Sequence, residues 1–334
     1  MTTPVRMGVA GAGSLGFHHI RILRELEDVS FSGFVEGRPD RAAQVASELG
    51  VKAYPHLALL LDDVDAITIV VPTPAHFEVA KQALELGKHV FIEKPITTTL
   101  DQADELLSIA RRTGALVQTG HVERFNRAVR AALPHVSRPR FIESERLAPF
   151  NLRGSDVAVV LDLMIHDIDL VLTLVGDTTD SITAVGVPVL TPMLDIANAR
   201  VTFTSGAVAN ITSSRISRER VRKIRIFQPS GYISLDLAAG GGEFFRLREK
   251  MDLRNPPSGP IDITDFVDRI PLTAPEGEPL KLEFESFVAA IRGEGPVLVT
   301  GEEGRRALAV ALRIVAEIER TAPAFAGDLA AARV

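Results

Sequence analysis

The sequence predicts an α/β protein: a doubly wound parallel sheet followed by an α+β domain with a large mixed or antiparallel, open-faced sheet. The chain has 334 residues, more than one ordinary hydrophobic core accommodates. Apolar strand-like runs alternate with helical patterns as far as residue 120, and strand-like runs follow one another directly from residue 181. We therefore expect two domains, residues 1–120 and 121–334.

The elements expected in the first domain alternate regularly. Strands are expected at 5–10, 31–36, 66–71, 89–92 and 116–119, and helices at 17–26, 39–49, 76–86 and 100–113. Pro39 suits the first turn of its helix, where its missing N–H is not needed, and Gly87 suits a helix C-cap. Right-handed crossovers between such strands produce a parallel sheet covered on both faces.

The second domain follows a different pattern. Strands are expected at 140–147, 182–189, 197–203, 208–214, 223–227 and 232–237, and helices at 124–133, 157–175, 283–292 and 302–320. Residues 240–242 and 255–260 are expected to be loops, and the Ala-rich tail from residue 322 to be frayed. Consecutive strands of period two form a sheet with one open face, which favours a homodimer or homotetramer.

The composition excludes several classes of protein. A net charge of -6 argues against non-specific nucleic-acid binding, and the absence of cysteine excludes disulfides and thiolate metal sites. No apolar run approaches the roughly 18 residues that cross a bilayer, and the N-terminus does not resemble a signal peptide. We expect a cytoplasmic protein with neither a membrane nor a nucleic-acid partner, and no metal in its site.

A glycine-rich turn joins the first expected strand to the first helix. Gly11 permits a tight turn, Gly13 lets the backbone approach a pyrophosphate, and Gly16 lets the helix pack on the strand. The helix N-terminus offers N–H groups and a partial positive charge to the phosphates. The sequence therefore predicts a dinucleotide site whose turn comprises Gly11, Gly13, Ser14, Leu15 and Gly16.

Glu36 indicates which dinucleotide is bound. It ends the second expected strand, about 20 residues beyond Gly16, where a carboxylate binds the adenosine ribose hydroxyls. A carboxylate at this place repels a 2′-phosphate, which favours NAD over NADP. Arg38 offsets part of that preference.

Other candidate cofactor contacts follow later strands, at the carboxyl edge of the sheet where ligands bind. They are Pro72, Thr73, His76, Glu93, Lys94, Pro95 and Gly120. The alternative for residues 72–76 is a plain turn in which His76 only starts a helix. Lys94 lies between an apolar strand and a proline, so its position is tightly determined.

Three ionisable residues lie on the otherwise apolar helix expected at 157–175. Asp162, His166 and Asp169 are spaced i, i+4 and i+7 and so project from one face. Burying such groups is expensive unless they are paired or functional. We interpret His166 as an acid/base residue oriented by Asp162. The alternative is a core histidine satisfied by two carboxylates.

Two basic clusters also need an explanation: residues 120–126 and the six cations Arg215, Arg218, Arg220, Arg222, Lys223 and Arg225. Such runs are usually a solvated sheet face or an oligomer contact. The alternative is an anionic substrate, because arginine makes bidentate contacts to phosphate.

Together these motifs resemble the Gfo/Idh/MocA family of oxidoreductases over nearly the whole chain. The resemblance rests on residues 11–16, 72–76, 93–95, 162–166, 283–291 and 300–304. It implies an N-terminal Rossmann domain and a C-terminal domain for substrate binding and oligomerisation. It also implies that Lys94 lies beside the nicotinamide and the reacting hydroxyl, that a cis bond precedes Pro95, and that Asp162 and His166 complete the site, with His166 as proton acceptor.

Residues 120–126 and 161–169 are similar to the branch of this family that oxidises the 3-hydroxyl of UDP-N-acetylglucosamine. The resemblance implies a sugar or nucleotide-sugar substrate and the catalytic residues Lys94, Asp162 and His166. Its expected substrate contacts are Lys94, His121, Arg124, Asp162, His166, Arg215 and Arg218. Where many members carry glycines, this chain has bulkier residues that reshape the pocket: Ala158, Val159, Val160, Leu163 and Met164.

Two other functions remain open. A dehydrogenase of a free polyol or cyclitol such as inositol would share the site but need no phosphate-binding arginines. A cofactor-sensing regulator without chemistry is compatible with the fold, because a fold does not determine a function. The presence of Lys94, Asp162 and His166 together argues against the regulator.

Overall fold

The computed structural model describes residues 3–152, 154–248 and 262–321. The chain divides into two compact units, each described here by itself. The first comprises residues 1–122 and 277–309, and the second comprises residues 123–276 and 310–334.

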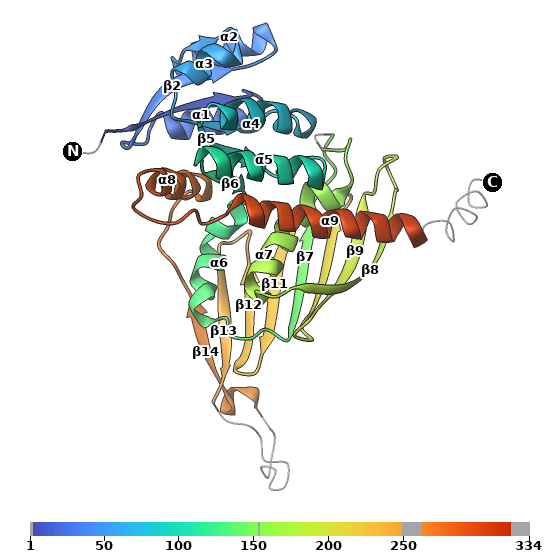
Figure 1. Cartoon of the computed structure of the whole chain (residues 1–334). Coiled ribbons are helices and arrows are strands. Elements are labelled where there is room, and N and C mark those ends of the chain that lie inside the picture. Colours follow the sequence, from blue (N-terminus) through green and yellow to red (C-terminus); the bar gives the residue numbers. More distant parts are fainter. Residues whose placement is uncertain (1–2, 153, 249–261, 322–334) are drawn as a thin grey trace, which may run out of the picture. The chain divides into compact units, whose positions relative to one another are not determined.

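The first unit is built on a six-stranded parallel sheet (Figure 1). In spatial order the strands are β3 (Ala53–Tyr54), β2 (Val29–Val35), β1 (Val5–Ala10), β4 (Ala66–Ile69), β5 (His89–Glu93) and β6 (Val117–Gly120). The order reverses between β1 and β4, and in such sheets ligands bind at the carboxyl ends of the strands at this point. All four residues of β4 are buried, as expected for a strand covered on both faces.

Helices connect these strands: α1 (Ser14–Leu23), α2 (Pro39–Leu49), α3 (Leu57–Asp62), α4 (His76–Glu85) and α5 (Leu100–Thr113). The predicted parallel sheet is confirmed, and α2 and α5 have the predicted bounds. The Thr99 hydroxyl accepts from the Gln102 N–H and so caps α5. The sequence does not predict β3 and α3, because a two-residue strand and a short, nearly all-apolar helix carry no readable period.

The chain returns to the first unit after residue 276. Helix α8 (Pro279–Ile291) buries Phe284, Phe287 and Val288 in the same cluster as Met7 and Ile20. The expected division after residue 120 leaves this segment in the second domain. An amphipathic pattern indicates that a helix has an apolar face, but not which sheet that face covers.

The second unit is built on an eight-stranded mixed sheet. In spatial order its strands are β14 (Val267–Leu272), β13 (Gly241–Leu247), β12 (Gly231–Asp236), β11 (Val221–Gln228), β7 (Phe141–Leu147), β10 (Val208–Ser214), β9 (Ile196–Phe203) and β8 (Thr179–Val187). Among the described strand pairs of this second sheet, only β7 and β10 are parallel, and the others are antiparallel. Helix α6 (Arg127–Ala132) contacts β12, β13 and β14, and α7 (Ile165–Val175) contacts β7 and β10 (Figure 1).

Three local predictions for this part of the chain need correction. Residues 240–242 do not form only a loop, because Gly241 begins β13 and a side chain at Gly242 would lie 2.5 Å from the Ser234 carbonyl. The helix expected at 124–133 is a 3₁₀ turn at Val122–Phe125 followed by α6. The helix expected at 157–175 begins with a π-helix at Val160–Met164 and continues as α7. The loop expected at 255–260 and the tail from residue 322 lie outside the described residues.

Among the described residues, the more exposed face of the second sheet carries an aromatic ladder. Phe141, Phe227, Tyr232 and Phe245 are register neighbours on β7, β11, β12 and β13. Successive ring centroids lie 5.7, 5.5 and 4.6 Å apart in stacked arrangements, and every ring is half-buried. The predicted open-faced sheet is thus present, and its open face is partly apolar.

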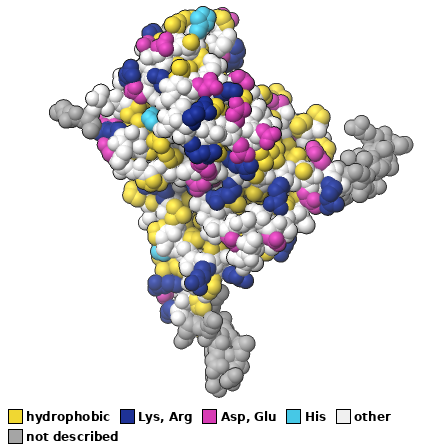
Figure 2. All heavy atoms as spheres, viewed as in Figure 1, with side chains coloured by type: hydrophobic (Ala, Val, Ile, Leu, Met, Phe, Trp, Pro, Cys, Tyr) yellow, Lys and Arg dark blue, Asp and Glu magenta, His cyan; other side chains and the backbone are white. Residues whose placement is uncertain are grey.

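Helix α9 (Gly301–Thr321) is the longest helix described, and its charged residues face solvent along much of its length. Lys and Arg side chains are interspersed with Asp and Glu on the face drawn in Figure 2. Among the residues described, every helix is too short or too polar to cross a membrane.

Candidate active site

The glycine turn of the first unit has the geometry of a phosphate-binding turn. Gly11 has φ +96°, and a side chain there would lie 2.7 Å from the Val70 carbonyl oxygen. A side chain at Gly16 would lie 2.0 Å from the Gly11 carbonyl oxygen, whereas nothing lies within 4 Å of one at Gly13. No side chain caps α1 at Gly13. The start of α1 thus has the open approach at Gly13 that a phosphate-binding turn requires.

Glu36 is positioned by this same turn. Its Oε2 accepts from the Ala12 N–H at 2.8 Å, and its Oε1 accepts from the Arg38 backbone N–H at 3.1 Å and Nε at 3.0 Å. Burial raises the pKa of Glu36, but these hydrogen bonds outweigh burial and the pKa lies below its ordinary value. The group is therefore a carboxylate at neutral pH.

His76 connects the loops that follow β4 and β5. Its Nδ1 lies 2.9 Å from the Pro95 carbonyl oxygen and its Nε2 lies 2.9 Å from the Val71 carbonyl oxygen. Burial lowers the pKa of this imidazole. The Lys94–Pro95 peptide bond is cis, as the resemblance implies. His76 thus holds the backbone beside Lys94, and its contact with a cofactor stays a prediction.

The residue before Lys94 belongs to a buried hydrogen-bond network that the sequence analysis did not predict. Thr68 Oγ1 lies 2.7 Å from His19 Nδ1, and His19 Nε2 lies 3.1 Å from Glu93 Oε1. Burial raises the pKa of Glu93, but the His19 hydrogen bond and nearby positive charges, including Lys94, lower it below its ordinary value. A side chain at Gly120 would lie 2.9 Å from the Glu93 carboxylate, so Gly120 leaves room for this group. The signal for His19 was its place on the buried face of α1, one turn after Gly16.

In the second unit, Asp162 lies within the π-helix and His166 lies in the first turn of α7. Both side chains are half-exposed, whereas Asp167 and Asp169 on the same helix are buried. π-helical turns are rare and occur frequently at functional sites. The carboxylate of Asp169 lies 2.7 and 2.8 Å from the Arg124 guanidinium, which accounts for this charge.

Arg146 neutralises the other buried carboxylate of α7. Its guanidinium contacts Asp167 at 2.6 and 3.1 Å and Glu123 at 2.8 Å, and only 3% of the residue is exposed. Burial lowers the pKa of Arg146, but the two carboxylates raise it by more than burial lowers it. The pKa of Arg146 therefore lies above its ordinary value. Asn126 Nδ2 donates to Glu123 Oε2 at 3.0 Å. This network attaches the helix of His166 to β7.

Four of the basic residues predicted to bind substrate, other than Lys94 and His166, lie in different surroundings. His121 is buried, and its N–H donates to the Thr119 carbonyl at 2.8 Å. Arg124 is paired with Asp169, and Arg218 is exposed. Arg215 is buried, and its guanidinium donates to the carbonyls of Gly154, Val157 and Leu194. Arg215 is therefore poorly placed to contact a diphosphate. Among the described residues, no group of three or more potential ligands could hold a metal ion.

Family models match both parts of the chain. Residues 5–121 match the model of the oxidoreductase family with an NAD-binding Rossmann fold, GFO_IDH_MocA. Residues 127–234 match the GFO/IDH/MocA C-terminal domain. The predicted resemblance is confirmed.

Individual proteins give a closer comparison. The chain is 36% identical over 316 residues to UDP-N-acetylglucosamine 3-dehydrogenase of Acidithiobacillus ferrooxidans, covering 94% of this chain and 97% of that protein. A solved structure of that dehydrogenase has a TM-score of 0.86 and 35% identity, covering 96% of this chain and 99% of the other. Myo-inositol 2-dehydrogenase of Thermotoga maritima is 27% identical, over 91% of this chain and 93% of the relative.

Replacing Arg146 tests whether its network holds the second unit together. We expect Arg146→Met to lower the free energy of unfolding by about 3–5 kcal/mol, because Asp167 and Glu123 are left buried without their partner. Chemical denaturation provides the measurement. The matched control is Arg269→Met, which removes an exposed ion pair with Glu243 on the same sheet and should have far less effect. Equal losses in the two variants would contradict this role.

Proposed function

Because this chain belongs to the Gfo/Idh/MocA family of NAD-binding oxidoreductases, we propose that it oxidises the 3-hydroxyl of UDP-N-acetylglucosamine, or of a related nucleotide sugar, to a ketone. The observation that carries the proposal is the near full-length similarity to the Acidithiobacillus ferrooxidans enzyme of that activity. The relative acts on a CH–OH group, and the fold and glycine turn described above are consistent with the same reaction class.

Residues of the first unit fit NAD. The open space at Gly13 and the uncapped start of α1 suit its pyrophosphate, with Ser14 and Leu15 in the first turn. The Glu36 carboxylate suits the ribose hydroxyls and opposes a 2′-phosphate. NAD, when bound, supplies the acceptor for the hydride that leaves the substrate carbon. The remaining proposed contacts are Gly11, Gly16, Arg38, Pro72, Thr73, His76, Glu93, Lys94, Pro95 and Gly120.

Three residues act on the reacting hydroxyl in this proposal, each in a different role. His166 takes the proton of the substrate hydroxyl as the C–H bond breaks and the C=O bond forms. Lys94 stabilises the negative charge that develops on the oxygen, and its own positive charge lowers the pKa of the adjoining Glu93 carboxylate. Asp162 orients His166. These roles follow the family resemblance and match the half-exposed positions of Asp162 and His166.

The surroundings of each residue shorten the set of candidate contacts to the substrate diphosphate. Arg218 is exposed and keeps its charge available for a diphosphate. Arg124 and His121 are retained as candidates, although Arg124 already pairs with Asp169. Arg215 is removed from this set, because its guanidinium donates to three carbonyls.

We also propose that the enzyme is a cytoplasmic homodimer or homotetramer joined through the open face of the second sheet. The aromatic ladder across β7, β11, β12 and β13 supports this, because half-buried stacked rings gain stability when a partner covers them. The absence of cysteine is consistent with a reducing compartment.

A panel of substrates separates this function from its alternatives. We expect NADH to form with UDP-N-acetylglucosamine and not with myo-inositol or free N-acetylglucosamine, measured as absorbance of the reduced cofactor. Inositol dehydrogenases are among the relatives, so a preference for myo-inositol would overturn the nucleotide-sugar assignment. Binding of NAD without turnover of any compound in a broad sugar panel would favour a cofactor-sensing regulator.

Variants of the two residues that act directly on the reacting hydroxyl test the mechanism. Lys94→Met and His166→Asn should each lower kcat by at least about 10²-fold, because each removes one group that acts on the reacting hydroxyl. NAD should still bind to both variants, measured by quenching or calorimetry. Near-normal turnover in either variant would contradict the assigned roles.

Glu36 provides the test of cofactor preference. Wild-type protein should bind NAD more tightly than NADP, and Glu36→Ser should narrow or reverse that difference, since the carboxylate that repels the 2′-phosphate is gone. Arg38→Ser, which keeps Glu36, should instead widen the preference for NAD. Tighter NADP binding by the wild type would show that Arg38 outweighs Glu36.

A further inference from the structure

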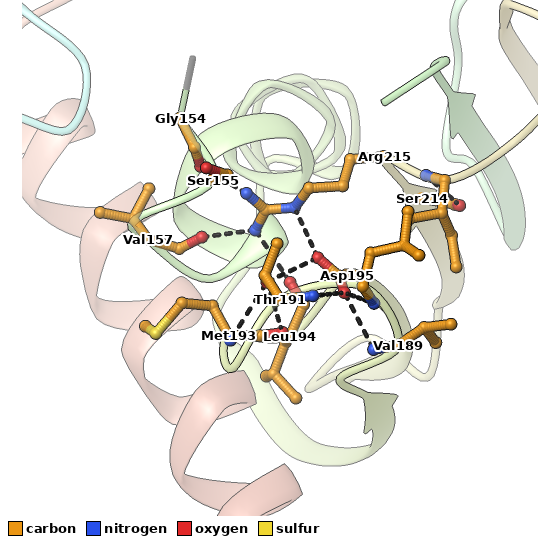
Figure 3. A network of polar contacts seen from close by, with 12 residues as sticks. Gly154, Ser155, Val157, Val189, Thr191, Met193, Leu194, Asp195, Ser214 and Arg215 are labelled. Carbon is orange, nitrogen blue, oxygen red and sulfur yellow. Dashed lines mark hydrogen bonds and ion pairs between the residues drawn. The ribbon is translucent and has the colours of Figure 1, made fainter. Parts of the chain in front are cut away.

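Arg215 lies at the centre of a buried network beyond the end of β10 (Figure 3). Only 3% of the residue is exposed. One terminal nitrogen donates to the Gly154 carbonyl, and the other donates to the Val157 carbonyl and, at 2.8 Å, to the Leu194 carbonyl. Its Nε lies 3.5 Å from Asp195 Oδ1. The donors that a phosphate would need are directed at the backbone instead.

Asp195 holds the other side of this network. Its Oδ2 accepts from the N–H groups of Val189, Leu190 and Thr191 at 2.9, 2.6 and 2.9 Å, and its Oδ1 accepts from the Thr191 hydroxyl at 2.8 Å. Burial raises the pKa of Asp195, but these hydrogen bonds lower it below its ordinary value. Asp195 is thus a buried carboxylate held in place by its own hydrogen bonds. Its contact with the guanidinium is an ion pair at 3.5 Å, and the Arg215 backbone N–H donates to the Asp195 carbonyl at 2.9 Å, so both charge and backbone hold Arg215 beside Asp195.

The turn that Arg215 holds contacts Asp162. Gly154 has φ +78°, and a side chain at this position would lie 2.7 Å from Asp162 Oδ2 and 3.2 Å from Oδ1. The Gly154 backbone therefore packs directly against the Asp162 carboxylate. The same Leu194 carbonyl that accepts from Arg215 also accepts from the Val159 N–H at 2.9 Å, immediately before the π-helix.

From these contacts we propose that Arg215, oriented by Asp195, is a positioning residue that sets the place of the Asp162 carboxylate. The inference rests on the proposed function, in which Asp162 orients the proton acceptor His166. Arg215 fixes residues 154 and 157, and the shared Leu194 carbonyl fixes the entry into the π-helix. The rare π-helical turn persists because the surrounding contacts determine it.

The geometry of the guanidinium explains why this position needs arginine. A planar fork with several fixed donors reaches three carbonyls and a carboxylate at once. Lysine carries the same charge on a single nitrogen and cannot reproduce this set of directions. Arg215→Lys therefore keeps the buried charge while releasing the turn at residues 154–157.

A double-mutant cycle between Arg215→Lys and Asp162→Asn tests the proposal. Arg215→Lys should lower kcat by about 10- to 100-fold with little change in KM for NAD. In the Asp162→Asn background the same substitution should change kcat by no more than about twofold, because its effect passes through Asp162. Arg320→Lys, at an exposed ion pair with Glu317 on α9, is the control and should leave kcat unchanged.

Two other kinetic results of this cycle would contradict the proposal. Additive losses of kcat would overturn the proposal, and a raised KM for UDP-N-acetylglucosamine with unchanged kcat would reassign Arg215 to the diphosphate. The cycle uses whichever substrate the wild type oxidises, so inactivity toward UDP-N-acetylglucosamine counts against the proposed function alone. Thr191→Val, which removes one hydrogen bond to Asp195, replaces Arg215→Lys if the latter does not fold.

A crystal structure of Arg215→Lys gives a readout that needs no activity. We expect residues 154–157 and the Asp162 carboxylate to move from their wild-type positions. An Asp162 carboxylate in the wild-type position would contradict the proposal, whatever the kinetics.

Discussion

Carboxylates removed from water must be paired, and this constraint organises the parts of both units that carry candidate site residues. In the first unit, Glu93 is buried against His19, directly before Lys94. In the second, Asp167 pairs with Arg146 and Asp169 pairs with Arg124. Each pair connects the segment that bears a candidate residue to a separate element of the same unit. If one partner were removed, the other would remain as an uncompensated charge, so these segments have little freedom to move.

In the proposed site, one helical segment carries both the buried, ion-paired carboxylates and the two candidate reacting residues. Asp167 and Asp169 point into the protein and are neutralised, while Asp162 and His166, nearby in sequence, stay half-exposed. The π-helix at Val160–Met164 changes the direction in which successive side chains project at this point. A site that exchanges a proton with a substrate needs side chains that are both accessible and fixed, and the buried pairs supply the second property.

Much of the fold was predictable because it depends on local patterns. The alternation of apolar strands and helices predicts the parallel sheet, and period two predicts most strands of the mixed sheet. The glycine turn is readable because Gly11 and Gly16 leave no room for a side chain, while Gly13 leaves open space for a ligand. That residues 277–309 belong to the first unit was not predictable. The amphipathic pattern of α8 does not indicate which hydrophobic core Phe284 enters. The π-helix was missed because its residues continue an apolar helical pattern.

The candidate site residues also divide into those that the sequence indicates and those that only the structure shows. Lys94, Asp162 and His166 are candidates from spacing and family resemblance, and their roles stay predictions. His19 was missed, because a histidine on an apolar helix face does not show which carboxylate it meets. Arg215 was predicted to contact phosphate, yet its sequence neighbours do not show that three carbonyls lie within its reach.

The most direct test of the account is to follow the hydrogen that leaves the sugar. UDP-N-acetylglucosamine carrying deuterium at C3 would be incubated with the enzyme and NAD, and the reduced cofactor analysed by mass spectrometry. The account predicts that the deuterium appears in the reduced cofactor and that the sugar becomes a 3-ketone. Reduced cofactor without deuterium, or a sugar that keeps its label while NADH forms, would contradict it.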